Sequence, residues 1–436
     1  MTVCPAALSF SSVFKRVLCA DFKGGNITSD AGALLLREAD RQLKFTARLA
    51  RCISDPRHPG LVEHTVLDML RQRTYGIALG YEDLNDFDTL RGDPLFQILT
   101  EKDAALASPP TLSRFENRIT HASLWRMAEF LVDQFIESFD GRPAQLVLDF
   151  DATEDEIHGR QERRFFHGYY DCYCFLPLYV FCGDKLLVSY LRPSNIDAAL
   201  HAGPILKLLV KKLRAAWPGV QIVMRGDSGF ARPRIMSWCE RNGVDFILGL
   251  ARNTRLETLS RPLMDAAKKG FGETKEKQRI FEWLTYKADS WRRHRRVIAK
   301  AEYDAKGENP RYVVTTLPGD AKTLYDSEYC ARGEMENRIK EHQSELFGGR
   351  TSCHKFASNQ FRLMLVSAAY VLMEHIRAHG LKGTELEQAQ CSTIRLKLLK
   401  IGAQIVKSVR RIVFHISGGY PNVDILTTAL ARLNSA

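Results

Sequence analysis

The sequence lacks several features that define other classes of protein. It has no uninterrupted run of about 18 apolar residues, the length that a membrane-spanning helix needs, so we expect no membrane partner. The apolar opening VCPAALSFSSVF is too short to cross a bilayer, and no basic residue precedes it. The 10 cysteines follow no regular spacing, which argues against a disulfide scaffold and predicts reduced thiols in a cytoplasmic protein. No internal repeat or low-complexity segment is present.

Length and composition favour a multidomain globular protein with a polyanionic partner. The 436 residues are too many for one compact core, so roughly two to four domains are expected. Hydrophobic residues make up 45% of the chain, which argues against general disorder. Lys and Arg number 62 against 51 Asp and Glu, and the resulting formal charge of +11 suits a polyanion.

Residues 1–140 are predicted to be mainly helical. Within them, SPPTLSRFENRI combines a proline stop with a new helix that carries Arg114 and Arg118 on its polar side. This pattern is typical of a helix that enters a DNA groove. An ordinary amphipathic helix with a solvated polar face is the alternative.

An α/β region begins where the period of the apolar residues changes, near residue 144. QLVLDFD, YYDCYCFLPLYVFCG and KLLVSYLRP predict three strands, the last two joined as an antiparallel pair. One helix then leads to the strand VQIVMRGD, and a second helix leads to the strand VDFILGLAR. This order matches a ribonuclease H-like mixed sheet with helices on its faces, and we assign residues 141–251 to its first part.

Three further regions follow along the chain. Residues 252–318 predict a β-rich insertion made of short strands and turns. Residues 319–380 predict the second part of the core, with one helix over 325–348 and another over 359–378. Residues 381–436 predict a basic C-terminal region containing the helix TIRLKLLKIGAQIVKS and the strand RRIVFHIS.

The insertion contains the densest group of cationic residues, SWRRHRR. Trp291 lies there among arginines, so the run offers both a ring for stacking on a base and charges for neutralising phosphate. A solvated strand face is the alternative. The cationic residues of this run are Arg292, Arg293, Arg295 and Arg296.

Acidic side chains occur at the ends of two of the predicted core strands. Asp149 and Asp151 are two residues apart in LVLDFDATEDE and share one face of the strand, so both remain candidates for a metal site. Asp227 follows the strand IVMRG, in a turn whose glycines permit unusual backbone angles beside a charged ligand. Converging carboxylates are costly to bury without cations, so the pattern indicates metal binding.

A third acid lies on the predicted helix EYCARGEMENRIKEHQ. Tyr329, Arg332, Glu336 and Gln343 are spaced by three, four and seven residues and therefore share one helical face. An acid flanked by Arg and Tyr is able to hold a metal while its neighbours contact a phosphate. Glu334 points roughly 200° away around the helix and is the weaker candidate.

Four blocks of sequence closely resemble the DDE transposases of bacterial insertion sequences, specifically insertion-sequence family 1380. The blocks are LDFDATEDEIHGRQE, MRGDSGFARP, YCARGEMENRIKEHQ and FASNQFRLMLVSAAYVLM. The resemblance extends from DFKGGNITSDAGALLLREAD near the start of the chain to RRIVFHISGGYP near its end. It implies an α/β fold with a ribonuclease H-like catalytic core, a β-rich insertion and an N-terminal helical DNA-binding region.

The resemblance also implies roles for individual residues. The acidic triad would be Asp151, Asp227 and Glu336, holding two Mg²⁺ ions with Mn²⁺ as a substitute; the family pattern of Asp followed two residues later by Ser or Thr favours Asp151 over its rival Asp149. Tyr329 and Arg332 would position phosphate. Gln343 stands where the family has Lys, and Lys340, one turn after Glu336, is placed to supply that charge.

The implied function is DNA transposition. Such an enzyme would bind the terminal inverted repeats of its own element, cleave double-stranded DNA there and transfer the freed 3′ end to target DNA. By the same resemblance, Trp291 would stack on a displaced base, and pairing of two element ends would require at least a homodimer. A bacterial, nucleoid-associated location follows. A nuclease that cuts without joining, or a domesticated DNA-binding protein without catalysis, is the alternative.

Overall fold

The computed structural model describes residues 8–435, which divide into two compact units. Unit 1 contains the chain up to Arg118, the short segment Glu345–Phe347 and the chain from Ala368 onward. Unit 2 contains Ile119–Ser344 and Gly348–Ser367. No helix within the described residues has both the length and the apolar character needed to cross a membrane.

Unit 1 is largely helical in its N-terminal part, as the sequence predicts. Its helices there are α1 Leu34–Leu43, α2 Phe45–Arg51, α3 Val66–Leu79, α4 Phe87–Leu90, α5 Pro94–Leu99 and α6 Pro109–Asn117. Thr65 begins α3 with a reciprocal cap, in which its hydroxyl accepts from the Asp68 amide and the Asp68 carboxylate accepts from the Thr65 amide. Arg73 on α3 and Glu116 on α6 form a fully buried ion pair of 2.9 Å, which holds the two helices in register.

The C-terminal part of unit 1 differs from the sequence prediction. The helix predicted over TIRLKLLKIGAQIVKS ends at Leu399, after α14 Cys391–Ile394 and one π-helical turn. Ala403–Lys407 is instead strand β16, which pairs with β17 Ile412–Ile416 and with β3 Ile27–Thr28. Gly402 interrupts the helix, and Ala403 and Ile405 are buried with the period of two that a strand produces. The strand predicted over RRIVFHIS is confirmed as β17, and α15 Val423–Asn434 follows it.

Unit 2 is built on one large mixed sheet. Its strands, in spatial order, are β12 Gln278–Tyr286, β13 Arg295–Asp304, β15 Arg311–Thr315, β11 Asp245–Leu250, β10 Gln221–Gly226, β4 Gln145–Ala152, β8 Leu178–Cys182 and β9 Lys185–Tyr190, with the short β14 Gly307–Glu308 paired to β13. β4, β10 and β11 are parallel, whereas β8 and β9 are antiparallel to their neighbours. The order β9-β8-β4-β10-β11 confirms the predicted ribonuclease H-like core.

The alternation of side chains along β4 separates the apolar core from the acids. Leu146, Leu148 and Phe150 point into the main core, which α7 His121–Glu137, α8 Ala202–Ala216 and α9 Pro233–Arg241 also line. Val147 points to the opposite face, where it packs near Leu324 and Tyr325. Asp149 and Asp151 follow Val147 on that second face, toward the carboxyl end of the strand.

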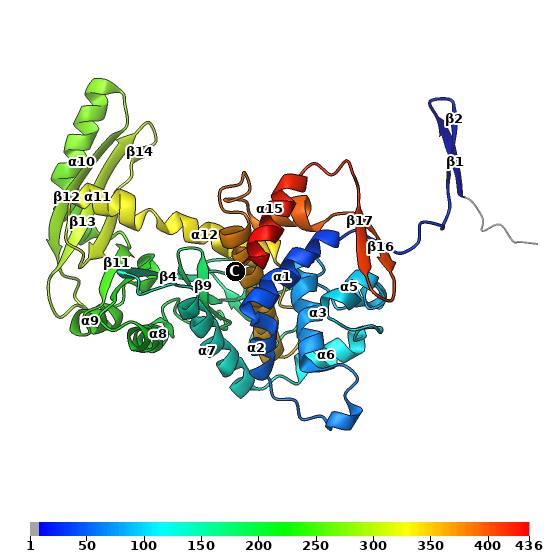
Figure 1. Cartoon of the computed structure of the whole chain (residues 1–436). Coiled ribbons are helices and arrows are strands. Elements are labelled where there is room, and N and C mark those ends of the chain that lie inside the picture. The colour runs from blue at the N-terminus through cyan, green and yellow to red at the C-terminus, as the bar shows by residue number, and fades with distance from the viewer. Residues whose placement is uncertain (1–7, 436) are drawn as a thin grey trace, which may run out of the picture. The chain divides into compact units, whose positions relative to one another are not determined.

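The predicted insertion contains a long helix that the sequence analysis missed. Thr254–Thr274 forms α10, where short strands and turns were expected, and α10 lies along β12 and β13 (Figure 1). Leu256, Ser260, Met264 and Ala267 are buried at helical spacing, whereas Pro262 and two glycines obscure that period in the sequence. The strands that follow pair onward from β11 through β15, so they extend the core sheet.

Candidate active site

Asp149 forms an ion pair with an arginine on the neighbouring strand β10. Arg225 lies directly opposite it on β10, and the Arg225 guanidinium binds both carboxylate oxygens, with Nη2 2.8 Å from Oδ2. Asp149 is only 1% exposed. A carboxylate that is buried and bound on both oxygens by arginine is occupied structurally, so this geometry favours its neighbour Asp151 as the metal-binding acid.

Asp151 lies one pleat further along β4 and is open to solvent on one side. Its side chain is 16% exposed, and Arg332 Nη1 lies 3.6 Å from its Oδ1. Burial raises the pKa of Asp151 to about 6; Arg332 opposes that rise, while the negative charges of Asp227 and Glu336 add to it. The three acids predicted from separate motifs therefore act on one another electrostatically.

Asp227 is positioned by the sharp turn that follows β10. Its Oδ1 accepts a hydrogen bond of 2.8 Å from the Gly229 amide. A Cβ at Gly229 would lie 2.9 Å from that same oxygen, so only glycine leaves the carboxylate in place. Neither Gly226 nor Gly229 has a positive φ, so the expectation of unusual backbone angles is wrong, and the glycines of the RGDSGF motif serve the acid by close approach alone.

Gly249 is a site residue that the sequence analysis did not single out. It lies within β11, beside Asp227, and a Cβ there would be 2.6 Å from Tyr329 Oη and 3.3 Å from the Asp227 carbonyl carbon. The absent side chain leaves the space in which the Tyr329 hydroxyl sits. An isolated glycine inside the apolar strand FILGL was the available signal, since such a glycine often marks a close approach.

The third acid and its partners come from one helical segment. A π-helical turn over Leu324–Tyr329 leads, after a short break, to α12 Arg332–Lys340. Arg332 Nη2 donates to Glu336 Oε1 at 2.5 Å, so one guanidinium links Glu336 to Asp151. Burial raises the pKa of Tyr329, with Arg332 opposing the rise and Asp227 adding to it. Tyr329, Arg332 and Glu336 therefore face the other two acids together, as their spacing predicts.

Gln343 fastens the end of this helix to the loop after β4. Its Nε2 donates to the Glu154 carbonyl oxygen at 3.1 Å, three residues beyond Asp151. Lys340 is exposed. The amide at position 343 thus has a structural contact of its own beside the acids.

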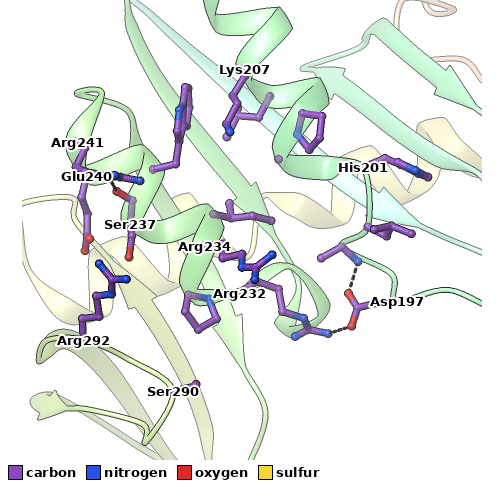
Figure 2. Close-up of a pocket in the computed structure, with 18 of the residues that line it drawn as sticks. Asp197, His201, Lys207, Arg232, Arg234, Ser237, Glu240, Arg241, Ser290 and Arg292 are labelled. Atoms are coloured by element: carbon purple, nitrogen blue, oxygen red, sulfur yellow. Dashed lines mark hydrogen bonds and ion pairs between the residues drawn. The ribbon is translucent and has the colours of Figure 1, made fainter.

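A basic groove borders the segment that follows Asp227. Its volume is about 1240 Å³, and it runs between the N-terminal part of α8, the length of α9 and the loop before β13. Figure 2 shows Arg232 and Arg234, at the start of α9, lying between Asp197 and Arg292. The cationic residues that line it are Lys207, Arg232, Arg234, Arg241, Arg292 and Arg293.

The acids of the groove leave most of these cations unneutralised. Asp197 binds Arg232 at 2.7 Å, and Glu240 binds Arg293 at 2.6 Å. Arg234 and Arg292, among the described residues, have no carboxylate within ion-pair distance. The groove therefore carries surplus positive charge.

Two residues of the predicted cationic run belong to the core instead of the surface. Trp291 is 5% exposed and packs edge-on against Tyr286 at 5.3 Å, so its ring is covered and offers no face for stacking on a base. Arg295 is buried too, and it donates to both carboxylate oxygens of Glu240 at 2.7 and 2.9 Å. The prediction that Trp291 and Arg295 contact DNA is therefore wrong. A large aromatic ring gains more from packing in the core than from standing among exposed arginines. Arg296 remains exposed, 3.8 Å above the Trp283 ring.

The two arginines predicted on the N-terminal helix lie in unit 1. Arg114 on α6 is exposed and donates to Thr111 at 3.2 Å. Arg118, directly after α6, lies 3.6 Å from Asp55 and stacks on the Phe115 ring at 5.6 Å. Arg114 is thus available to a ligand, whereas Arg118 is partly engaged within the unit.

The family model described as transposase DDE domain group 1 matches residues 10–436, nearly the whole chain. The chain belongs to this transposase family. No curated protein matches it. Among solved structures, the chain is similar to the cryo-EM structure of a piggyBac transposase synaptic complex with hairpin DNA, at 11% identity and a TM-score of 0.41, over 85% of this chain and 80% of that chain.

The donor set of this transposase suits a hard divalent cation. Within residues 8–435 there is no preassembled group of three or more His, Cys, Asp or Glu at metal-binding spacing. Asp151, Asp227 and Glu336 nevertheless offer the oxygen ligands that Mg²⁺ prefers. Burial raises the pKa of Asp151 and the repulsion among the acids adds to the rise; a bound cation relieves that repulsion. In this structure the Arg332 guanidinium supplies positive charge between two of them.

Proposed function

We propose that this transposase binds the terminal inverted repeats of its insertion sequence, cleaves DNA at the element ends and joins the freed ends to target DNA. The observation that carries the proposal is the convergence of Asp151, Asp227 and Glu336, from three separate elements, around Arg332 and Tyr329. This arrangement supports phosphoryl transfer because acids and a guanidinium together suit a phosphodiester and its cations.

In the proposed reaction the acids would bind cations, and their neighbours would orient the phosphate. Asp151, Asp227 and Glu336 would hold Mg²⁺, or Mn²⁺ in its place, which when bound assists the nucleophile and stabilises charge on the attacking and leaving oxygens. Arg332 and the Tyr329 hydroxyl would orient the phosphate. Water would add to phosphorus as the 3′ oxygen leaves and takes up a proton; that 3′ hydroxyl would then displace a strand oxygen of the target phosphodiester.

Binding surfaces on both units would hold the DNA. The surplus cations of the basic groove, chiefly Arg234 and Arg292, support a path for the phosphate backbone beside the acids. Lys340 and Arg114, both exposed, would add phosphate contacts. We further propose that the N-terminal helices within residues 1–140 read the terminal repeats. At least a homodimer would hold two element ends together.

A matched pair of variants tests the catalytic assignment. Glu336→Gln and Glu334→Gln remove one charge each from exposed positions on the same helix. The substrate is labelled DNA containing the sequences that flank the coding region, incubated with Mg²⁺ or Mn²⁺. We expect Glu336→Gln to lower the cleavage rate on the order of 10³-fold and Glu334→Gln to leave it near wild type. Equal cleavage by both variants would refute the assignment.

A strand-transfer assay separates transposition from the two alternative functions. Cleaved, labelled ends are incubated with supercoiled plasmid, and joined products are resolved on a gel. Transposition predicts labelled plasmid in the presence of a divalent ion. Cleavage without joining would identify a nuclease, and salt-sensitive binding without cleavage would identify a domesticated DNA-binding protein.

A further inference from the structure

A small sheet beside the acids presents an unusual number of exposed aromatic side chains. It consists of β5 Asp155–Glu156, β6 Phe165–His167 and β7 Cys172–Phe175, and is called here the aromatic flap. Four of its aromatic residues are exposed to solvent: Phe165 (40% exposed), Phe166 (53%), Tyr169 (85%) and Tyr173 (46%). Apolar surface gathered in this way usually marks a binding site, because single exposed rings are common but clusters are not.

The flap is firmly attached on its inner side. Ile157 and Phe175 are buried, and Phe175 meets the Phe356 ring at 5.3 Å. The Glu162 amide donates to the His354 carbonyl oxygen at 2.9 Å, and the Glu162 carboxylate accepts from the Phe356 amide at 3.0 Å. The exposed rings therefore project from an anchored support, and they are not a hydrophobic face left over from loose packing.

Chain connectivity places the flap at the catalytic edge of the sheet. It leaves from the end of β4, directly after Asp151, and returns to the start of β8, which pairs with that same end of β4. The acids act electrostatically on Tyr170 of the flap: burial raises its pKa to about 12, with Glu154, Asp151 and Asp227 adding to the rise. Tyr169 packs edge-on against Tyr170 at 4.9 Å and so lies one ring further out.

Arginines accompany the rings. The Arg164 guanidinium lies 4.7 Å from the centre of the Tyr173 ring, and Arg163 lies 5.1 Å from that of Phe356. Arg160 is exposed nearby. Rings for stacking, interleaved with cations for phosphate, are the surface that binds unpaired nucleotides. The alternative occupant is a second copy of this chain, and we do not favour it because a purely apolar contact between copies would not call for arginines among the rings.

We propose that the aromatic flap stacks the unpaired bases of the DNA strand whose phosphate lies at the acids, with Tyr169 and Phe166 as the outer stacking surfaces. This inference rests on the proposed function and assigns to the flap the base contact that the covered Trp291 ring does not offer. Tyr169 and Phe166 are positioning residues, since they contact the strand away from the reacting phosphate. Duplex DNA presents no free base faces, so the flap favours DNA ends that are frayed or single-stranded.

The test compares two DNA probes that differ only at their end. One is a blunt duplex carrying the element end, and the other has four additional unpaired nucleotides at the cleavage side. The full chain is titrated against each, and the ratio of the two Kd values is the readout. We expect wild type to prefer the unpaired end and Tyr169→Leu to reduce that preference about tenfold, which corresponds to the loss of about 1.4 kcal/mol from one stacked base.

Two matched variants isolate the stacking. Tyr169→Phe keeps the ring and is expected to keep the preference, whereas Trp125→Leu removes an exposed ring from α7, outside the flap, and is expected to change nothing. Circular dichroism confirms folding of each variant. If Tyr169→Leu weakens both probes equally, or weakens neither, the flap does not read unpaired bases even though cleavage stands. If wild type binds neither probe, the proposed function fails and the flap inference fails with it.

Discussion

Replacing Gly249 by alanine is expected to damage catalysis more than folding. The added methyl carbon would lie 2.6 Å from Tyr329 Oη and 3.0 Å from the Ser228 amide nitrogen. Relaxed contacts of this kind are about 3.5 Å, so one group has to move by about 1 Å. Gly249 pairs with Val313 inside the sheet, and moving β11 would strain that ladder. The Tyr329 hydroxyl, at the end of a side chain, is the cheaper group to displace.

The expected magnitudes follow from that displacement. Overpacking of a well-filled site costs about 1–3 kcal/mol of unfolding free energy. A shift of about 1 Å in a group that positions substrate lowers the rate about 100-fold, which corresponds to about 2.7 kcal/mol in the barrier. We therefore expect Gly249→Ala to reduce cleavage about 100-fold with a modest fall in Tm.

The assay measures cleavage rate and Tm on the same preparations. Gly272→Ala is the control, because a Cβ at Gly272 meets no atom within 4 Å. The double variant Gly249→Ala, Tyr329→Phe loses the hydroxyl that makes the closest contact, so it should regain Tm relative to Gly249→Ala alone. Cleavage at the wild-type rate by Gly249→Ala would refute the close packing of Tyr329 against β11.

Three further predictions distinguish structural from catalytic residues. Asp149→Ala leaves Arg225 buried without its partner and should lower the unfolding free energy by about 3–5 kcal/mol in urea titrations; a loss below about 1 kcal/mol would contradict the buried pair. The folded-state pKa of Asp151, about 6, lies above the ordinary value of 3.8 for an aspartate, so the folded chain binds the extra proton and stability is lost as pH rises from about 4 to about 6. Without divalent ions this loss of unfolding free energy should reach up to about 3 kcal/mol in wild type and be absent in Asp151→Asn. If the two proteins show the same dependence of stability on pH, the raised pKa of Asp151 is refuted. Trp291→Ala should destabilise by about 3–5 kcal/mol, whereas Arg292→Ala should leave Tm unchanged and reduce the salt slope of DNA binding by about 1; the reverse pattern would restore Trp291 to the surface.

Local pattern was sufficient to predict the core strands and the face of the Glu336 helix. Short apolar runs predicted β4, β10 and β11, and helical spacing put Tyr329, Arg332 and Glu336 on one face. Local pattern was insufficient at Asp149 and Asp151, since two residues on one strand face look alike. Arg225 distinguishes them, and its place opposite Asp149 depends on the pairing of β4 with β10, which local spacing does not encode.

The same non-locality explains the errors in the insertion. SWRRHRR looks exposed because charge dominates the run, yet Glu240 on α9 draws Arg295 inward and Trp291 is buried in the main core. The sequence also did not predict that the rings of the aromatic flap are exposed, because aromatic residues in a strand normally indicate burial. Burial of a given ring depends on which elements cover it, and nothing in the run itself records that.

The charges around the acids suit this edge of the sheet to the phosphoryl transfer that we propose. Asp149 is neutralised by Arg225, while Asp151 and Glu336 share the single cation Arg332. Asp227 receives a hydrogen bond from the Gly229 amide, which carries no net charge. The three outer acids therefore exceed their cations by two charges, a deficit that divalent ions are suited to fill. Surplus positive charge lies in the basic groove, whose Arg232 follows Asp227 by five residues along the chain, so the proposed polyanion would be attracted to the groove and metal ions to the acids.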